Sequence, residues 1–404
     1  MRLLIFNAGS SSLKFQLFEA GDAGLQPVAR GAVSGLGADA LCRYQINATQ
    51  EEERAHIADH AQAARWVFAR MQKHFGPSWG HSITATGHRV VHGGTLFTAP
   101  ARVTPEVLAG IESLNLLAPL HNPAAVAVIR ACRNELGAAH AAVAVFDTAF
   151  FHALPDAART YAVPAEWTSK FGIRRYGFHG IAHRYMYERY LEISAADKDA
   201  SRVVTLQLGQ GCSITALRGG NPVDTSMGFT PLEGLIMATR PGDVDAGVLL
   251  HLLEQGVSLP ELSEGLHNRS GLLALSAASA DMRTLLQLEG QGHAGAVRAV
   301  EAFCLRARKY LGAYVALLGG ADAVIFGGGV GEHAPEVRAR ILRQMEWCGV
   351  RLDETANAAA CGVEHRISAT GSTLAVYVVP VDEEKLIARE VREHLAASGA
   401  ANAT

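Results

Sequence analysis

Two arginines stand among small or apolar neighbours, where a lone positive charge would be costly. Arg89 lies in GHRVVHGG and Arg240 lies in ATRPGDVD. A guanidinium in such surroundings needs an anionic partner, and its planar fork suits a carboxylate or a phosphoryl group held through paired hydrogen bonds. The two arginines therefore predict an anion clamp. The alternative is that each pairs with a nearby carboxylate of the chain, such as Asp243 or Asp245 for Arg240.

Acidic side chains follow two predicted strands at the points where those strands end. Asp147 ends the apolar run AAVAVFD, and Asp382-Glu383-Glu384 follow an apolar strand that we expect to run to Val379. Polar residues at the carboxyl ends of strands often face a ligand crevice, and Mg²⁺ binds one or two carboxylates beside its phosphates. Asp147 therefore predicts a residue that faces a ligand crevice, and the acids at 382–384 predict a Mg²⁺ site, with a turn or helix cap as the alternative for each.

Two histidines, His179 and His183, lie four residues apart in RRYGFHGIAHRY. This spacing could place both rings on one helix face as metal ligands, but no Glu follows His179 as the zinc-protease pattern requires. We therefore discount a zinc site. Two roles stay open for His179, a catalytic side chain or a core histidine with satisfied hydrogen bonds.

Turns rich in small residues follow two similar apolar strands. In NAGSSSLKF, the turn after Asn7 could present N–H groups and hydroxyls to a phosphate, with an ordinary hairpin as the alternative. RLLIFNAGSSSLKF from Arg2 and RVVTLQLGQGCSIT from Arg202 share the order arginine, strand, small-residue turn, strand. Unless this echo is a chance match, it predicts two similar domains, each offering a turn of phosphate size.

A third such turn lies in ADAVIFGGGVGEHAPEVRARIL. We expect a strand over 323–326, a glycine turn over 327–331 and a helix from about Ala334. Glycines let a ligand approach the backbone, and a helix N-terminus favours a negative or polar ligand edge. The turn lacks both the Gly-Lys-Ser/Thr of a P-loop and the acidic residue at the Rossmann spacing, so it identifies neither motif.

The composition is that of a large globular protein. The chain has 404 residues, 49% hydrophobic and 19% charged, which is enough for two domains. A net charge of −3 gives no reason to expect nucleic acid or an anionic membrane as partner. The six cysteines form no CxxC pair and suit a reducing compartment. Without a signal-peptide pattern or a run of about eighteen uncharged apolar residues, we expect a cytoplasmic protein.

Predicted strands alternate with predicted helices along the chain. The run 142–146 reads as a strand, and 123–136 and 181–191 read as helices. This alternation predicts an α/β architecture with mixed sheets.

These segments, in this order, resemble the acetate kinase family nearly end to end. The matching stretches are NAGSSSLKF, GHRVVHGG, PLHNP, FDTAFF, RRYGFHG, DTSMGFTPLEGLIMATRPGDVD, SADMR, FGGGVGEH and DEEKLIARE. The resemblance implies two duplicated α/β domains of the sugar kinase, Hsp70 and actin (ribonuclease H-like) type, with mixed sheets flanked by helices and the nucleotide in the cleft. It also implies a homodimer. The expected domains are 1–148 with 385–404, and 149–384, which would carry the adenosine site.

The resemblance also implies a role for each matching residue. The reaction would be reversible transfer of the ATP γ-phosphoryl group to acetate, giving acetyl phosphate. Catalysis would fall to Arg89, Arg240, His179 and Asp147. Mg²⁺, or Mn²⁺ in its place, would be positioned by Asn7 and Glu383, with Asp147 acting through water. The substrate would contact Arg89, Val91, Leu120, Phe178 and Pro231. The nucleotide would contact Ser10, Ser12, Lys14, Gln207, Gly209, Gln210, Gly211, Asp281, Met282, Arg283, Gly329, Val330, Gly331, Glu332 and His333.

Three residues depart from the family pattern. Gln207 and Gln210 stand in QLGQG where the family usually reads HLGNG, and His333 stands where the adenine loop usually ends in Asn. These changes leave the reaction class intact but open the choice of phosphoryl donor. The enzyme alternatives are a relative acting on propionate or butyrate, or one using pyrophosphate. A nucleotide-gated interaction protein like Hsp70 is the alternative from another class, and the chain has no obvious peptide-binding segment to support it.

Overall fold

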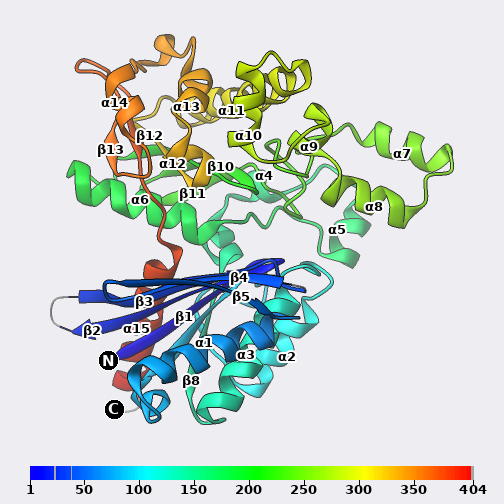
Figure 1. Cartoon of the computed structure of the whole chain (residues 1–404). Helices are drawn as coiled ribbons and strands as arrows, with labels where there is room; N and C mark the ends of the chain where they lie inside the picture. The colour runs from blue at the N-terminus through cyan, green and yellow to red at the C-terminus, as the bar shows by residue number, and fades with distance from the viewer. Residues whose placement is uncertain (22–23, 38, 402–404) are drawn as a thin grey trace. The chain divides into compact units, whose positions relative to one another are not determined.

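The computed structural model of the chain describes residues 1–21, 24–37 and 39–401 (Figure 1). The chain divides into two compact units, Met1–Phe150 with Asp382–Thr404, called unit 1, and Phe151–Val381, called unit 2. The domain boundaries expected from the sequence stay a prediction, and residues 402–404 of the first expected domain lie outside the described residues.

Unit 1 is built on a mixed sheet of eight strands in the order β5-β4-β3-β2-β1-β6-β8-β7. Its strands are β1 (Arg2–Ala8), β2 (Ser12–Gly21), β3 (Gly24–Ser34), β4 (Asp39–Ile46), β5 (Thr49–His56), β6 (Ala85–Val90), β7 (Ala101–Arg102) and β8 (Ala141–Phe146). Its helices are α1 (His60–Phe75), α2 (Pro105–Ser113), α3 (Asn122–Leu136) and α15 (Glu383–Ala401), with the 3₁₀ helices η1 (Trp79–Ser82) and η2 (Asp147–Ala153).

Strand β1 is buried on both faces, because helices cover both sides of the sheet. Its even-numbered residues Leu4 and Phe6 share one apolar core with Val67 of α1 and Val128 of α3. On the other side, a Cβ on Gly87 of β6 would come within 2.7 Å of Ile5 and 2.8 Å of Val391 of α15. Alternate residues of a strand point to opposite faces, so α15 packs on the face opposite to α1 and α3 (Figure 1).

Unit 2 is built on a second mixed sheet of six strands in the order β11-β10-β9-β12-β14-β13. Its strands are β9 (Arg202–Leu208), β10 (Cys212–Arg218), β11 (Asn221–Thr225), β12 (Ala323–Gly327), β13 (His365–Arg366) and β14 (Ala375–Val378). Its helices are α4 (Asp156–Arg159), α5 (Ala165–Phe171), α6 (Gly180–Ser194), α7 (Ala246–Glu254), α8 (Leu259–Asn268), α9 (Gly271–Ser276), α10 (Met282–Gly290), α11 (Ala294–Leu318), α12 (Gly328–His333), α13 (Pro335–Leu342), η3 (Glu346–Cys348) and α14 (Glu354–Ala359).

The two sheets repeat one arrangement. In unit 1, β1 is antiparallel to β2 and parallel to β6, which is parallel to β8. In unit 2, β9 is antiparallel to β10 and parallel to β12, which is parallel to β14. Strands β1 and β9 begin at Arg2 and Arg202, the two arginines that open the sequence echo. The predicted duplicated α/β fold with mixed sheets is confirmed.

The glycine-rich segment after β12 differs from the sequence expectation. A turn was expected over 327–331, but α12 begins at Gly328 and α13 follows at Pro335. The Gly328 N–H donates to Glu332 Oε1 at 2.8 Å, so a side chain within the segment binds the first amide of the helix. Gly328 also takes φ +74° with its backbone against Leu208, a conformation that favours glycine. Elsewhere the observed bounds fall close to the expected ones, and β14 ends at Val378 rather than Val379.

Within the described part of the chain, no helix combines the length and apolar character that crossing a membrane requires.

Candidate active site

Three parallel strands of unit 1 bring the first group of predicted residues together. Asn7 on β1 lies opposite Arg89 on β6, and Asp147 directly follows Phe146, the β8 residue opposite Val90. Parallel strands end at the same edge of a sheet, so these three polar side chains gather there although 140 positions separate the first from the last. At the same edge, α15 begins with Glu383 and Glu384.

Arg89 is at the centre of this group. Its Nε and Nη2 donate to Asp147 Oδ2 at 3.1 and 2.5 Å, and its Nη1 donates to Asn7 Oδ1 at 3.0 Å. Asn7 Nδ2 donates in turn to Glu383 Oε2 at 2.7 Å and to Glu384 Oε1 at 2.8 Å. The carboxylate alternative therefore holds for Arg89, but its partner Asp147 lies far along the sequence, and the pair belongs to a cluster of three acids.

Burial and charge oppose each other in this cluster. Burial alone would lower the pKa of Arg89, but Asp147 and Glu383 outweigh it, and the net shift is upward. Burial raises the pKa of Glu384, against the charge of Lys14, which lowers it. The cluster holds three carboxyl groups around one guanidinium, so it carries an excess of acidic groups that a cation could balance.

The predicted phosphate turn of unit 1 is shorter than the sequence suggested. Asn7 and Ala8 belong to β1 and Ser12 to β2, so the turn is Gly9 to Ser11. Ser10 and Lys14 are exposed and Ser12 is half-buried. The ring of His60, the first residue of α1, contacts the Gly9 carbonyl through Nε2 at 2.7 Å. Sequence reasoning missed His60, because nothing near it in the chain marks the contact.

In unit 2, the end of the β9–β10 hairpin meets the segment that carries Arg240. Ala238 N donates to Gln210 O at 3.0 Å, and Met237 N donates to Arg240 O at 3.0 Å. A Cβ placed on Gly211 would lie 2.8 Å from Arg240 Nη2 and 3.3 Å from His179 Nε2. Gly211 is thus the point beside which the guanidinium and the imidazole meet, and any larger residue would displace them.

Arg240 has no carboxylate partner among the described residues. Its Nη1 donates to the Pro231 carbonyl at 3.0 Å, and burial lowers its pKa. The two acids proposed as its alternative partners are used elsewhere. Asp243 accepts from Tyr310 Oη and Gly234 N, and Asp245 caps α7 through Gly247 N. The pairing alternative is therefore wrong for Arg240, and a partly buried positive charge is left for an anionic ligand.

His179 occupies a strained position. It is the N-cap of α6 with φ +59°, a left-handed conformation that residues other than glycine rarely adopt. Its Nδ1 lies 2.9 Å from Ser213 Oγ, and the next histidine, His183, contacts the same oxygen through Nε2 at 2.7 Å. The two rings thus share a serine rather than a metal, and among described residues no group of three His, Cys, Asp or Glu could hold a metal ion.

The four residues expected at the substrate methyl divide between the units. Val91 and Leu120 belong to unit 1, where Val91 is buried and Leu120 is 50% exposed. Phe178 and Pro231 belong to unit 2, where Phe178 is buried next to His179 and Pro231 accepts from Arg240. Phe178 is therefore the chain neighbour of His179, and Pro231 is bonded to Arg240, both of which are predicted catalytic residues of unit 2.

Apart from Ser10, Ser12 and Lys14 of unit 1, the residues expected at the nucleotide lie on three parts of unit 2. Gln207 is the penultimate residue of β9, and its buried Oε1 has no hydrogen-bond partner among described residues. Asp281 caps α10 by accepting from Thr284 N at 3.0 Å, beside buried Met282 and exposed Arg283. Gly329 to His333 lie on α12, where a Cβ on Gly329 would meet nothing within 4 Å. The open side of α12 leaves room for a ligand there.

Sequence reasoning missed the residue that holds α12 in place. Arg338 of α13 is fully buried and donates to the carbonyls of Gly331 and Glu332 at 2.8 and 3.1 Å. It also donates to Asn357 Oδ1 and to the Asn357 and Ala360 carbonyls. Glu332 Oε1 accepts the N–H groups of Gly328 and Val381 at 2.8 and 3.1 Å. Both side chains therefore organise the backbone of the expected adenosine segment.

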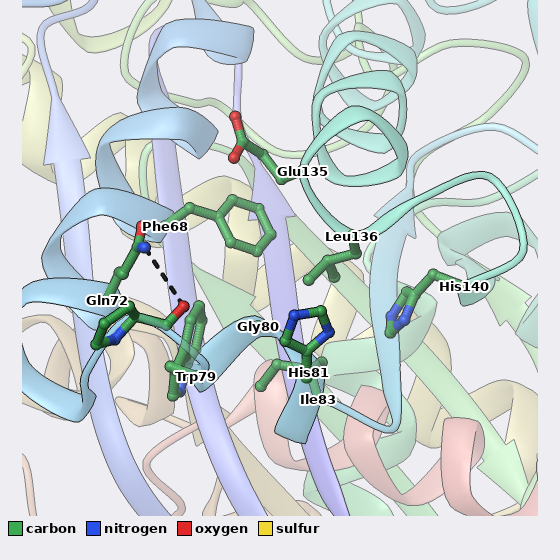
Figure 2. Close-up of a pocket in the computed structure, with 10 residues that line it drawn as sticks. Phe68, Gln72, Trp79, Gly80, His81, Ile83, Glu135, Leu136 and His140 are labelled. Carbon is green, nitrogen blue, oxygen red and sulfur yellow. Dashed lines mark hydrogen bonds between the residues drawn. The ribbon is translucent and has the colours of Figure 1, made fainter.

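A cavity of about 380 Å³ lies elsewhere in unit 1 (Figure 2). Figure 2 shows its apolar wall, which includes Phe68, Trp79 and Leu136, with His140 at one side. None of the residues predicted for the site lines it. Within the described part of the chain, Trp79 Nε1 and His140 Nε2 have no hydrogen-bond partner, but both atoms are shielded from solvent and so from a ligand in the cavity. The cavity takes no part in the site.

Comparison with known proteins shows which family the chain belongs to. The model of the acetokinase family matches residues 2–389. The chain belongs to the acetokinase family. The acetate kinase of Solibacter usitatus is 43% identical over 96% of this chain and 97% of its own length. The acetate kinase of Bacillus subtilis is 40% identical over 96% of this chain and 98% of its own length.

Solved structures of this family share the fold. The crystal structure of Porphyromonas gingivalis acetate kinase matches with a TM-score of 0.89 and 38% identity, over 98% of this chain and 99% of that one. A propionate kinase from Francisella tularensis matches with a TM-score of 0.88 and 33% identity, over 96% of this chain and 98% of that one. The family and fold predicted from the sequence are confirmed, and the reaction class follows: a phosphotransferase with a carboxyl group as acceptor.

Proposed function

We propose that the chain transfers the γ-phosphoryl group of ATP reversibly to acetate, giving acetyl phosphate and ADP. The observation that carries this proposal is Arg240, a guanidinium beside His179 without a carboxylate partner among the described residues. A positive group held this way stabilises negative charge that arrives with the substrate and grows in the transition state. Phosphoryl transfer needs such positioning and charge more than covalent catalysis.

In this proposal the cluster around Arg89 in unit 1 binds the metal ion, and Arg89 itself is the second arginine of the site. Asn7, Asp147 and Glu383 offer amide and carboxylate oxygens, the donor type that Mg²⁺ prefers, so the residues fit this ion. Asn7 and Glu383 would hold it, Asp147 would act through water, and Mn²⁺ could replace it. When bound, the ion supplies positive charge to the phosphates. Since Arg89 now bonds to Asn7 and Asp147, we propose that Arg89 exchanges part of these bonds for bonds to the phosphoryl group.

The nucleotide role rests on the backbone of unit 2. Gly209 to Gly211 form a tight turn in which Gly209 N donates to Gly211 O at 3.1 Å, and Gln210 is exposed at its tip. We propose that this turn and the Ser10, Ser12 and Lys14 turn of unit 1 bind the phosphates. Asp281 to Arg283 and α12 would bind the adenosine, with Glu332 acting through the backbone that it holds.

Acetate is preferred over longer acids in this proposal. Phe178 is fully buried and Val91 nearly so, and bulky side chains of this kind limit the space for an acyl chain. One surplus methylene changes the preference by only about 1 to 3 kcal/mol, so propionate should be a usable but poorer substrate. A propionate kinase among the similar structures keeps that acid as the second candidate.

One assay tests the substrate and the donor together. The purified enzyme is supplied with acetate, propionate or butyrate and with MgATP or magnesium pyrophosphate, and the acyl phosphate is trapped with hydroxylamine. We expect the highest kcat/KM for acetate with ATP. A higher kcat/KM for butyrate would overturn the acetate assignment. Product from pyrophosphate with none from ATP would overturn the adenosine assignment.

We also propose that the chain acts as a homodimer in the cytoplasm. Helices α7 and α8 of unit 2 contain no buried residue, yet they expose Leu250 and Leu259 at 61% and 69%. A second copy of the chain could cover these apolar side chains. Light scattering after size exclusion should give twice the chain mass, and Leu250→Glu should shift it towards the monomer.

A further inference from the structure

A line of hydrogen bonds runs inward from His179 through unit 2. His179 Nδ1 lies 2.9 Å from Ser213 Oγ, Ser213 Oγ lies 2.7 Å from His183 Nε2, and His183 Nδ1 lies 2.7 Å from Thr205 Oγ1. Ser213, His183 and Thr205 are all fully buried. We call these three residues the buried relay. Buried polar groups of this kind must satisfy one another.

Counting protons leaves two arrangements of the relay. The Ser213 hydroxyl has one proton and lies between two imidazole nitrogens, so one imidazole must donate to Oγ. Burial is the main cause that lowers the pKa of His183, and a proton on His179 would lower it further, so His183 is neutral with a single N–H. In the first arrangement His183 Nε2–H donates to Ser213, which donates to His179 Nδ1. In the second, His179 Nδ1–H donates to Ser213, Ser213 donates to His183 Nε2, and His183 Nδ1–H donates to Thr205.

The two arrangements leave different atoms facing the substrate side of His179. In the first, a neutral His179 carries its proton on Nε2, the nitrogen beside Gly211. In the second, a neutral His179 carries its proton on Nδ1, and the Nε2 lone pair would repel an anion. Only the first arrangement makes a neutral His179 a hydrogen-bond donor to a phosphoryl oxygen.

The surroundings of His179 disfavour a cation. His179 caps the N-terminus of a helix of fifteen residues, the positive end of its dipole. Arg240 Nη2 lies beside the same point as His179 Nε2. Burial raises the pKa of the Cys212 thiol on β10 to about 12, so this neighbouring group brings no negative charge. A neutral ring can donate from Nε2 here without adding a second positive charge.

We propose that Thr205, His183 and Ser213 are positioning residues that hold His179 in its neutral Nε2–H form. Thr205 donates to His183 Nδ1, His183 Nε2–H donates to Ser213, and Ser213 donates to His179 Nδ1. The relay thereby fixes both the ring orientation and the position of the proton. This inference rests on the proposed role of His179 in phosphoryl transfer, but the tautomer can be measured without any turnover.

The first test is a long-range ¹H–¹⁵N spectrum of the enzyme labelled with ¹⁵N-histidine, in which His179→Asn assigns the signals of His179. We expect the neutral Nε2–H pattern at pH 7. In Ser213→Ala the fixed tautomer should give way to a mixture. A protonated ring in the native enzyme, or an unchanged Nε2–H pattern in Ser213→Ala, would overturn the proposal. Loss of activity in His179→Asn alone speaks only to the proposed function.

The second test uses a matched pair of substitutions. Thr205 and Thr215 face each other on β9 and β10, and both are fully buried. Thr215 Oγ1 bonds to Thr225 Oγ1 at 2.9 Å, outside the relay. Thr205→Val should lower kcat by about 3-fold to 10-fold with KM for acetate unchanged, and Ser213→Ala by about 10-fold to 100-fold. Thr215→Val should change neither kcat nor the histidine spectrum.

A conservative substitution completes the test. Ser213→Thr keeps the hydroxyl and should restore most of the kcat that Ser213→Ala loses, together with the native histidine spectrum. Equal losses of kcat in Thr205→Val and Thr215→Val would instead mean that a general loss of β-sheet packing causes the effect, and the positioning role would be refuted.

Discussion

Arg89 places two of its nitrogens, Nε and Nη2, on one oxygen of Asp147, at 3.1 and 2.5 Å, while its third nitrogen, Nη1, bonds to Asn7. This pairing keeps the guanidinium in one orientation at the edge of the β1–β6–β8 strands. It also leaves the cluster able to exchange partners, because Asn7 is bonded to Glu383 and Glu384 as well. In the proposed function, this guanidinium would exchange part of these bonds for bonds to an anion.

Removing this guanidinium should remove most of the activity. Arg89→Ala should lower kcat by about 10³-fold, by comparison with arginines that balance charge on a transferring phosphoryl group. Arg89→Lys should recover little, since lysine lacks the planar fork. Steady-state kinetics give the answer, with Arg43→Ala as control, because Arg43 pairs with Glu52 at 2.6 Å on an exposed surface. Near-native kcat in Arg89→Ala would exclude Arg89 from catalysis.

Replacing Arg240 should lower the activity and raise the stability of the enzyme. Arg240→Met keeps an unbranched apolar stem but removes a partly buried charge that has no carboxylate partner in the described structure, so kcat should collapse while Tm rises by about 2 °C or more. Calorimetry and kinetics on the same preparation test both effects. A fall in Tm would show that the Pro231 contact outweighs the cost of burying the charge.

The size of the acyl pocket should depend on Val91. Val91→Ala frees space, so the ratio of kcat/KM for propionate to that for acetate should rise severalfold. Val103→Ala is the matched control, since Val103 is also buried in unit 1 but has no predicted contact with substrate. An equal change of the ratio in both variants would refute the assignment of Val91 to the pocket.

We expect Gln207 to bind ATP less tightly than the histidine that is usual at this position would. Its Oε1 is buried without a partner among described residues, and a glutamine supplies neither the ring nor the possible charge of the usual histidine. Gln207→His should therefore lower KM for ATP, whereas Gln210→Asn, at the exposed tip of the same turn, should change it little. Initial rates at saturating acetate and fixed Mg²⁺ measure both. If Gln207→His raised KM for ATP, the expected phosphate contact would be refuted.

Stability should fall in mild acid because of His88. Burial, and then the charge of His140, lowers the pKa of His88 to about 3. Between the usual value near 6.5 and about 3, the unfolded chain binds a proton that the folded protein does not, so the free energy of unfolding decreases as pH falls. Urea unfolding at pH 7 and pH 5 should show a smaller decrease in His88→Gln than in the native enzyme. Equal decreases would mean that His88 does not contribute.

The sequence predicted the parts of this structure that depend on local pattern. The strands that begin at Arg2 and Arg202 and the turns after them reveal the duplication, because apolar alternation and small residues leave few other options. The start of α12 could not be found this way, since it depends on a bond from Gly328 to the carboxylate of Glu332. Glycines alone favoured a turn.

The predicted site residues make contacts that the sequence did not reveal. Sequence suggested Asp243 for Arg240, but Asp243 instead binds Tyr310, 67 positions away. Sequence reasoning also missed His60 and Arg338. The partner printed for His60 and most partners of Arg338 are backbone carbonyls, which leave no mark in a sequence. The spacing of His179 and His183 suggested metal ligands on one helix face, whereas in the structure both rings contact the Ser213 hydroxyl.

The bond from Asn7 to Glu383 spans 376 positions and sets an order of events during synthesis of the protein. At roughly 5 to 20 residues per second, Asn7 leaves the ribosome about 20 to 75 s before its carboxylate partner is made. Unit 2 is continuous in sequence but ends only two positions before Glu383, and the sheet of unit 1 must wait for α15 to cover its second face. The nascent chain therefore lacks the complete Arg89 cluster until Glu383 and Glu384 have been made.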